Sequence, residues 1–310
     1  MDDLRADEAC SARDQDHGSI LGRRCITFPA KGNCGIGRWL TAAFAAAALI
    51  VVASATSQVV SERTAFRAVS VPAGATKNVS VSCPAGYFAL SAGAAKSGAG
   101  ISELEARPLS TRRFAFRLAN ASSLAQRVTV AAACRRVWTG GRKASHLKLA
   151  ARRHVTLKVA QSSQRQTRFT CPSGTVPAAG GFDLGRGKLS VRQQTQDLHV
   201  LTFAVSNAGA APRSASFYAS CLTVVHPAGE RAAKLQVSLG TDSVPLRNGS
   251  QVVTRLCPKG WLSLAAGYSL PAGVELNGAA AVGRTARWTL TNPAQKPVLA
   301  DLQLACARLV

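Results

Sequence analysis

The sequence contains few acidic residues and few aromatic ones. Fifteen Asp and Glu stand against 38 Lys and Arg, so the net charge is +23, and aromatic residues make up 5% of the chain. Nine acids follow Thr56, and glycoside hydrolysis needs two carboxylates that face each other across a cleft. Glu103 and Glu105 would share one face of an extended segment, where we expect both carboxylates to be solvated. The sequence therefore gives no support for a glycosidase.

The motifs of other enzyme and metal-site classes are also missing. There is no G-x-S-x-G elbow, no H-E-x-x-H, no phosphate-binding loop and no calcium-loop pattern. Four of the five histidines fall in one stretch at irregular spacings, without carboxylates beside them: His146, His154, His199 and His226. We therefore expect a protein that is not an enzyme, with no cofactor and no metal site.

Helical periodicity is absent after the apolar run near the N-terminus. Hydrophobic residues nevertheless make up 47% of the chain, which is enough to build a core. The apolar residues are largely Ala, Val and Leu, and such small side chains favour thin, closely packed sheets over a deep ligand cavity. The composition thus predicts an all-β protein.

The cysteines show that one unit occurs three times. A Cys-Pro-x-Gly is followed by a second cysteine at separations of 51, 50 and 49 residues. A fixed period of this kind indicates a repeat architecture. The spacing predicts disulfides between Cys83 and Cys134, between Cys171 and Cys221, and between Cys257 and Cys306. Disulfides are typical of proteins that fold outside the cytoplasm, and each loop of this length is worth about 4 kcal/mol in the chain-entropy treatment.

Three other residue types recur in register with the cysteines. A glycine lies ten residues after each first cysteine, an asparagine lies fourteen residues before each second cysteine, and an aromatic residue lies four residues before that asparagine. The sets are Gly93, Gly181 and Gly267; Asn120, Asn207 and Asn292; and Phe116, Phe203 and Trp288. We interpret the asparagine as a turn residue, because its side chain caps turns and it tolerates left-handed backbone.

Period-two alternation predicts the strands of each unit. In the last strand of the first unit, Val128, Val130, Ala132 and Cys134 share a core face, and Arg127, Thr129, Ala131 and Ala133 share the other. We expect the aromatic strand, the Asn turn and the Cys-ending strand to form a hairpin. The fold class predicted is three tandem, disulfide-stapled, antiparallel β-sandwich-like repeats at residues 61–138, 144–226 and 231–310.

The pattern resembles a domain of secreted bacterial proteins, mainly actinobacterial, in which Cys-Pro-x-Gly precedes a Gly-rich turn, an aromatic strand ending in Asn and a strand ending in Cys. The resemblance covers most of residues 65–310, and the Gly-rich turn is best preserved at 179–182. It implies export and disulfide-bonded β structure. It implies no chemical activity.

An N-terminal helix is expected before the repeats. Residues 39–52 are apolar, follow basic residues and precede Ala53-Ser54-Ala55, as in a secretory signal peptide cleaved before Thr56. The apolar stretch can also be extended to residue 60 as an uncleaved membrane anchor, with residues 1–38 as a leader or cytoplasmic segment. Both interpretations place the repeats outside the cytoplasm.

The basic charge suggests a class of partner. From Thr56 onward, 32 Lys and Arg stand against nine acids, and such a field attracts polyanions. The densest stretch supplies the candidate polyanion-binding residues: Arg142, Lys143, Lys148, Arg152, Arg153 and Lys158. The alternative is a solvated strand edge that charge protects from aggregation.

The function expected is an exported, non-enzymatic binding or structural protein of the cell envelope or exterior. Its partners would be anionic polysaccharide, wall polymer or extracellular nucleic acid. Two alternatives remain: a membrane-anchored extracytoplasmic protein, and an enzyme or inhibitor with a loop-borne site in one repeat. The sequence leaves open the ligand, the oligomeric state and the packing between repeats.

Overall fold

The computed structural model describes residues 58–96, 100–139, 145–150, 152–185, 188–228 and 233–310. The expected leader and nearly all of the expected signal or anchor helix lie outside these ranges. Within these ranges, no helix is long and apolar enough to cross a membrane. Every regular element described is a β-strand, so the all-β class is confirmed.

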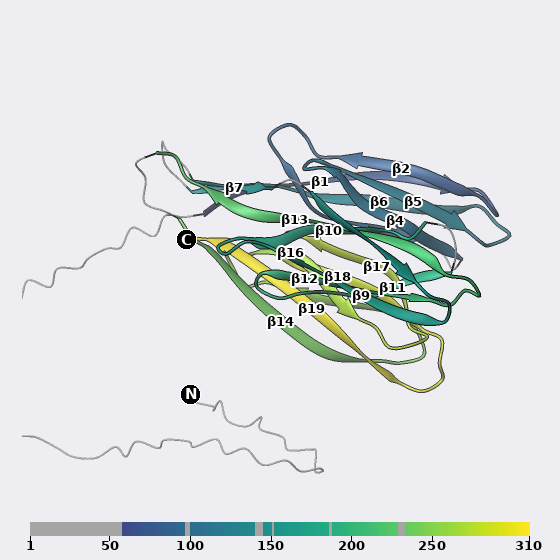
Figure 1. The fold of residues 1–310 in the computed structure, drawn as a ribbon. Coiled ribbons are helices and arrows are strands. Elements are labelled where there is room, and N and C mark those ends of the chain that lie inside the picture. The colour runs from purple at the N-terminus through teal and green to yellow at the C-terminus, as the bar shows by residue number, and fades with distance from the viewer. Residues whose placement is uncertain (1–57, 97–99, 140–144, 151, 186–187, 229–232) are drawn as a thin grey trace, which may run out of the picture. The chain divides into compact units, whose positions relative to one another are not determined.

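The strands fall into three consecutive sets (Figure 1). The first set is β1 (Gln58–Val71), β2 (Thr76–Ser82), β3 (Phe88–Lys96), β4 (Ile101–Ser110), β5 (Arg113–Asn120) and β6 (Gln126–Thr139). The second set is β7 (His146–Leu149), β8 (Arg153–Val159), β9 (Ser163–Thr170), β10 (Val176–Asp183), β11 (Leu189–Gln196), β12 (Val200–Asn207) and β13 (Arg213–Val225). The third set is β14 (Leu235–Leu246), β15 (Gly249–Leu256), β16 (Leu262–Ser269), β17 (Glu275–Val282), β18 (Thr285–Asn292) and β19 (Val298–Leu309).

Strand pairing follows one pattern in all three sets. The strand with the second cysteine lies between two neighbours, giving what we call the Cys sheets: β1-β6-β3, β8-β13-β10 and β14-β19-β16. In the second set β7 continues the β8 side of β13, and it also pairs with β6 of the first set. The strand ending in asparagine lies between two others, giving the Asn sheets: β2-β5-β4, β9-β12-β11 and β15-β18-β17. All of these pairs are antiparallel.

The expected hairpin of aromatic strand and Cys-ending strand is wrong. β5 pairs with β2 and β4, whereas the following strand β6 pairs with β1 and β3, so the two consecutive strands do not pair with each other. The asparagine at the crossing stabilises it. Asn120 Nδ2 donates to the carbonyls of Val71, Pro72 and Leu124, and Asn120 Oδ1 accepts from Ser122 N. Alternation shows which face of a strand is buried, and it does not show which strand is its neighbour.

The Cys-Pro-x-Gly segment forms a tight turn in each set. Pro ends the strand because it cannot donate to a ladder. The glycines at the fourth position have φ of 80°, 77° and 81°, a left-handed backbone that glycine adopts at little cost. A hydrogen bond to the proline carbonyl closes each turn, with the donors Tyr87 N, Thr175 N and Trp261 N.

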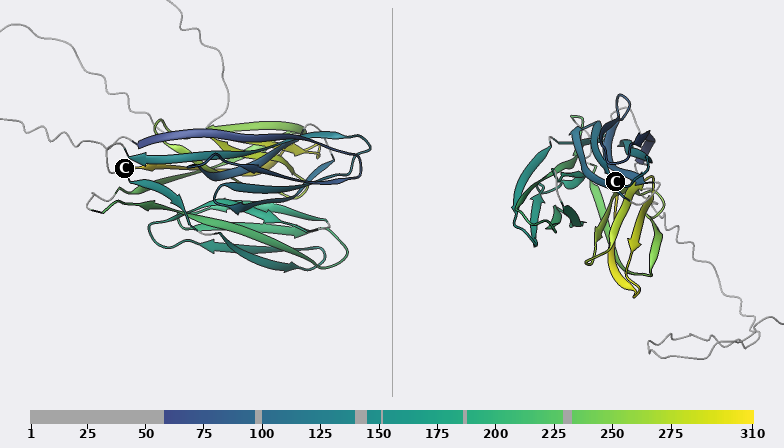
Figure 2. Two further views of the ribbon diagram at one scale, coloured as in Figure 1. Left: turned by 90° about the horizontal axis from the view of Figure 1, so that it is seen from above. Right: turned by 90° about the vertical axis from the view of Figure 1, so that its right-hand side faces the viewer.

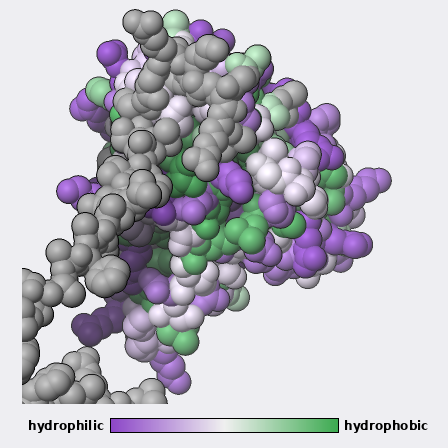
Figure 3. Space-filling view, turned by 90° about the vertical axis from the view of Figure 1, so that its left-hand side faces the viewer, coloured by the Kyte–Doolittle hydropathy of each residue, from purple (hydrophilic) through white to green (hydrophobic). Residues whose placement is uncertain are grey.

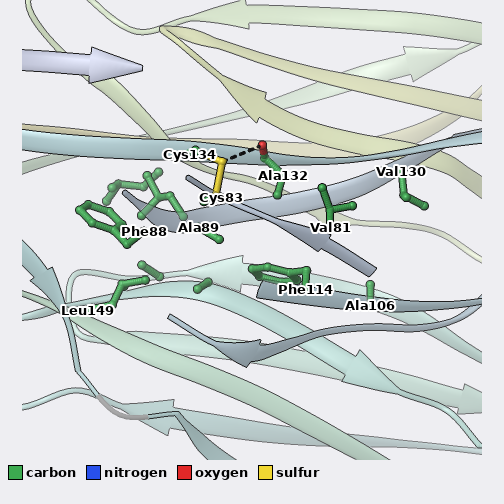
Figure 4. Close-up of a cluster of buried hydrophobic side chains, with 14 of the residues drawn as sticks. Val81, Cys83, Phe88, Ala89, Ala106, Phe114, Val130, Ala132, Cys134 and Leu149 are labelled. Carbon is green, nitrogen blue, oxygen red and sulfur yellow. Dashed lines mark hydrogen bonds between the residues drawn. A yellow bond between two sulfur atoms is a disulfide. The ribbon is translucent and has the colours of Figure 1, made fainter. Parts of the chain in front are cut away.

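The three disulfides pair as the spacing predicts. Cys83 follows β2 of an Asn sheet and Cys134 lies in β6 of a Cys sheet, so the bond joins the two sheets through the core. Figure 4 shows Val81, Phe114 and Val130 among the buried side chains around this bond. Each bridge connects strands of one set only.

The three sets are arranged around a common centre (Figure 2, right). β10 of the second set pairs with β4 of the first, and β16 of the third set pairs with β11 of the second. At the third junction β17 lies beside β3, where Ser91 Oγ donates to the Ala281 carbonyl at 2.9 Å. Each junction thus joins one Asn sheet to the next Cys sheet, and the third junction closes the ring. We call these junctions seams.

The ring changes the burial of the last strand in each set. Ala133, expected on an outer face, is buried, as are Leu222 and Ala307 on the corresponding faces of β13 and β19. These side chains lie where the three sets meet, beside a hydrophobic cluster that draws residues from all three sets. The part of the strand around the cysteine is therefore buried on both faces, because one face packs within its own set and the other packs on the remaining sets.

Candidate functional site

The structure places part of the predicted polyanion site on two adjoining elements. Arg142 and Lys143 lie outside the described residues. Lys148 is exposed on β7, and Arg152, Arg153 and Lys158 are exposed in or just before β8. The guanidinium groups of the two arginines already donate to carbonyls: Arg152 to Pro108 at 2.5 Å and Arg153 to Thr170 at 2.9 Å.

The structure adds cations from a neighbouring strand. Arg165 and Arg168 are exposed on β9, which follows β8 after a short turn. β8 is the edge of one Cys sheet and β9 is the edge of one Asn sheet, and neither strand contains an acid. We call Arg153, Lys158, Arg165 and Arg168 the basic edge. Its position at free strand edges fits the protective role of edge charge as well as a binding role.

A second candidate site is a cavity at the centre of the ring. Its volume is about 350 Å³, and residues from β3, β4, β10, β11, β16 and β17 line it. These six strands are the ones that form the three seams. Small side chains were expected to exclude a deep cavity, and the cavity exists because it lies between the sets rather than within one of them.

The repeated glycines create the close approach of strands at the seams. A Cβ on Gly93, Gly181 or Gly267 would lie under 3.0 Å from a carbonyl oxygen of the neighbouring set, closer than real Cβ atoms approach. Those oxygens belong to Ala279, Ala106 and Gln194. The recurrence of glycine ten residues after each first cysteine therefore reflects packing between sets.

Lys96 and Glu103 are polar at positions where the other sets are apolar. Lys96 lies thirteen residues after its first cysteine, and the equivalent residues are Leu184 and Leu270. Glu103 precedes the irregularity in β4, and the residues that precede the matching irregularities in β11 and β17 are Val191 and Leu276. Both side chains line the cavity, and Lys96 Nζ donates to the Leu276 carbonyl at 3.3 Å.

Burial shifts the acidity of both groups. It raises the pKa of Glu103 to about 7, and the charge of Lys96 opposes that rise. Burial likewise lowers the pKa of Lys96, against the attraction of Glu103 and Glu275. The expectation of a solvated carboxylate is wrong for Glu105, which is 7% exposed and pairs with Arg107 at 2.5 Å, and Glu103 is half-buried.

Tyr268 and Arg192 line the same cavity. Tyr268 is buried, and burial together with the charge of Glu103 raises the pKa of its hydroxyl well above the ordinary value, so it stays protonated. The Arg192 guanidinium donates to the carbonyls of Val274, Leu270 and Pro271, which are in the third set. Burial lowers its pKa.

Gln196 presents an amide without a protein partner. The residue is 4% exposed, it lines the cavity, and neither Nε2 nor Oε1 has a hydrogen-bond partner among the described residues. Its backbone is held in place, because Gln196 N donates to Gln303 Oε1 at 2.6 Å and Gln303 Nε2 donates to the Gln196 carbonyl at 2.8 Å. A buried amide in this state costs about 1–3 kcal/mol, so it needs an explanation.

These cavity residues are the part of the site that sequence reasoning missed. They are scattered along the first, second and third sets, and the signal that could have found them is a polar residue at a position that is apolar in the other two repeats. The polar residues come from β3, β4, β11 and β16. The end of the molecule with the C-terminus shows hydrophobic residues in the middle, surrounded by hydrophilic ones (Figure 3).

Comparison with known proteins adds no assignment. No protein-family model matches the chain, and no curated protein is significantly similar to it. In the part of the chain that the structure describes, no three His, Cys, Asp or Glu side chains gather as metal ligands would.

Proposed function

We propose that this chain is an exported, non-enzymatic binding protein of the cell envelope or exterior that holds anionic polymers on its basic surface. In this proposal it consists of three tandem, disulfide-stapled β-sandwich-like repeats of the secreted bacterial Cys-Pro-x-Gly type. Three intramolecular disulfides fit an oxidising compartment outside the cytoplasm. Delivery by a cleaved signal peptide or retention by an N-terminal anchor is part of the same proposal.

The observation that carries the proposal is the basic edge. Four exposed cations occupy two adjacent strands with no acid between them. Among the described residues four ion pairs occur, and none of them involves a cation of the edge. Arg153 donates to the Thr170 carbonyl, and its charge, like that of the other edge cations, is not balanced by an acid. These cations can therefore bind phosphate, sulfate or carboxylate groups of a polymer, which would displace counterions.

Affinity chromatography tests this function. The full chain with its disulfides intact should stay on heparin resin at about 0.5 M NaCl, beyond the salt at which purely non-specific charge contacts are lost. The variant Arg153→Ser/Lys158→Ser/Arg165→Ser/Arg168→Ser should elute at clearly lower salt. Elution of the unaltered chain at physiological salt would contradict the proposal. The basic surface would then serve to keep the protein soluble and would not bind polymers specifically.

A matched variant controls for net charge. Arg247, Lys259, Lys296 and Arg287 are exposed residues of the third set, and replacing all four by serine removes the same charge elsewhere. Retention should then fall much less than in the edge variant. Equal losses in the two variants would show that total charge alone determines binding and would contradict a site at β8 and β9.

A further inference from the structure

We propose that one end of the molecule lies on the surface of a membrane that contains anionic lipids. This end carries the three Cys-Pro-x-Gly turns, the start of β1, the last residues of β6, β13 and β19, and the C-terminus (Figure 1). We call it the cysteine end. The inference rests on the location outside the cytoplasm that the proposed function includes, and it does not depend on the basic edge.

Contacts between the sets show that their ends form one surface. β6 pairs with β7 at Trp138, and β7 pairs with the last four residues of β13. Arg135, near the end of β6, donates to the carbonyl of Gly283 in the turn between β17 and β18. The carbonyl of the next residue, Arg284, accepts from Cys257 N of the third Cys-Pro-x-Gly turn. The cysteine end therefore combines residues of all three sets.

Two tryptophans and a tyrosine are only partly buried at the cysteine end. The guanidinium of an arginine lies over each ring, at 4.8 to 5.7 Å from the ring centre. The pairs are Arg63 with Tyr87, Arg136 with Trp138, and Arg308 with Trp261. Indole and phenol rings collect at membrane–water interfaces, because their bodies are apolar and their N–H or O–H groups reach water. An arginine beside such a ring can extend into the headgroups, so these pairs suit the headgroup level of a bilayer.

Exposed aliphatic side chains lie at the same end. Leu198 is 50% exposed in the turn between β11 and β12, where the His199 carbonyl accepts from Cys171 N. Leu256, the last residue of β15, is 63% exposed, and Val310 is exposed as well. Figure 3 shows hydrophobic residues in the middle of this end with hydrophilic ones around them. A lipid surface would remove these side chains from water without the need for a pocket.

The charge of the cysteine end suits anionic headgroups. Among the described residues, the acids in these turns and strand ends are Glu62, which pairs with Arg135 at 2.6 Å, and Asp197. Exposed cations outnumber them: Arg63, Arg112, Arg136, Lys234, Lys259 and Arg284. Basic segments are attracted to the negative surface of such a membrane. The same cations would repel the cysteine end of a second copy, so a lipid surface fits better than self-association.

The chain also enters the described residues at this end. β1 begins at Gln58, opposite Thr139 of β6. The apolar run ends at residue 52, and the segment between it and β1 can span at most about 20 Å. If the run is retained as an anchor, the cysteine end therefore stays close to the bilayer.

Quenching of tryptophan fluorescence by brominated lipid tests the contact, because bromine quenches tryptophan only at short range. The probe is a vesicle of brominated phosphatidylcholine and phosphatidylglycerol at about 7:3. The full, disulfide-intact chain carries Trp39→Phe, so its emission comes from Trp138, Trp261 and the buried Trp288. We expect quenching that disappears in the further variant Trp138→Phe/Trp261→Phe. It should fall at least about threefold when phosphatidylglycerol is omitted.

A pair of leucine variants locates the contact. Leu198→Ser/Leu256→Ser should lower the quenching at least about twofold, because two aliphatic side chains no longer enter the lipid. Leu124→Ser/Leu299→Ser makes the same change in exposed residues at the opposite end and should leave the quenching unchanged. Equal losses in the two variants, or equal quenching without phosphatidylglycerol, would overturn the proposal.

Flotation of the same vesicles separates this contact from anchoring. A chain that floats with the vesicles without being quenched would show that the N-terminal run alone holds the protein, and this would overturn the proposal. A chain that does not float would overturn it too. Heparin retention is measured separately, so failure of the cysteine end and failure of the basic edge can be told apart.

Discussion

At the scale of single residues, the repeated asparagines act as buried cross-links. Asn207 repeats the contacts of Asn120: its Nδ2 donates to the carbonyls of Val159, Ala160 and Ala211, and its Oδ1 accepts from Gly209 N. The expected left-handed backbone is not its role, since the non-glycine residues with positive φ among those described are Ser162 and Ala179. The capping role of the side chain is the part of the interpretation that holds.

Replacing one of these asparagines should cost much stability. Asn207→Ala leaves several buried carbonyls without a donor, so we expect a loss of about 2–4 kcal/mol in urea unfolding under non-reducing conditions. Asn248→Ala is the control, because Asn248 donates to the Pro293 and Ala294 carbonyls from an exposed position. Similar losses in both variants would contradict a special role for the buried amide.

The seam glycines make the second prediction at this scale. Gly181→Ala places a methyl group against the Ala106 carbonyl of the neighbouring set, so the seam must shift. We expect a loss of about 2 kcal/mol or more, measured by the same unfolding experiment. Gly240→Ala, with no atom within 4 Å of the added methyl, should change stability by less than about 0.5 kcal/mol. If Gly181→Ala were as mild, the strands would not approach closely in solution.

At the scale of elements, the polar pair on β3 and β4 interrupts an otherwise apolar pattern. Lys96→Leu/Glu103→Val gives these strands the residues that the other sets carry. Burial disfavours the charged form of each of these side chains, so replacing both by apolar residues of similar volume should raise the melting temperature. Lys96→Leu alone should destabilise, because it leaves Glu103 buried without its cation. A fall in stability of the double variant below that of the single one would refute this account.

The acidity of Glu103 predicts a pH dependence. Between the ordinary carboxyl pKa of 4.5 and about 7, the folded protein holds a proton on Glu103 that the unfolded chain has released. Glu103 therefore weakens folding progressively as the pH rises through this window, and by a constant amount above it. Glu103→Gln should match the unaltered chain near pH 4 and exceed it in stability above pH 7, with Lys96, Tyr268 and Glu275 still facing the position. A difference independent of pH would show that Glu103 titrates normally.

The elements also show what the sequence could and could not predict. Cysteine spacing identified the three disulfides, and alternation identified strands such as β5 and β6 with their core faces. It assigned those two strands to one hairpin wrongly, because a pattern along one strand carries no information about the partner strand. The sequence could not predict that Lys96 and Glu103 line a cavity. That position depends on the seam between β3 and β17, which joins Lys96 to a residue 180 positions away.

At the scale of the whole molecule, three similar sets of strands close on themselves within one chain. A contact that joins unlike faces of equivalent units gives a ring when the rotation closes, as in cyclic oligomers. Here the last junction, between β3 and β17, connects the first set with the third. The cavity, with its polar side chains from several sets, is a consequence of that closure.

Differential scanning calorimetry of the chain with and without Gly93→Ala tests the closed ring most directly. The closed ring predicts one cooperative transition with equal calorimetric and van't Hoff enthalpies. In Gly93→Ala this whole transition should move to lower temperature, because the added methyl group is too close to the Ala279 carbonyl. Two or three separate transitions, of which the variant shifts none or only that of the first set, would contradict it.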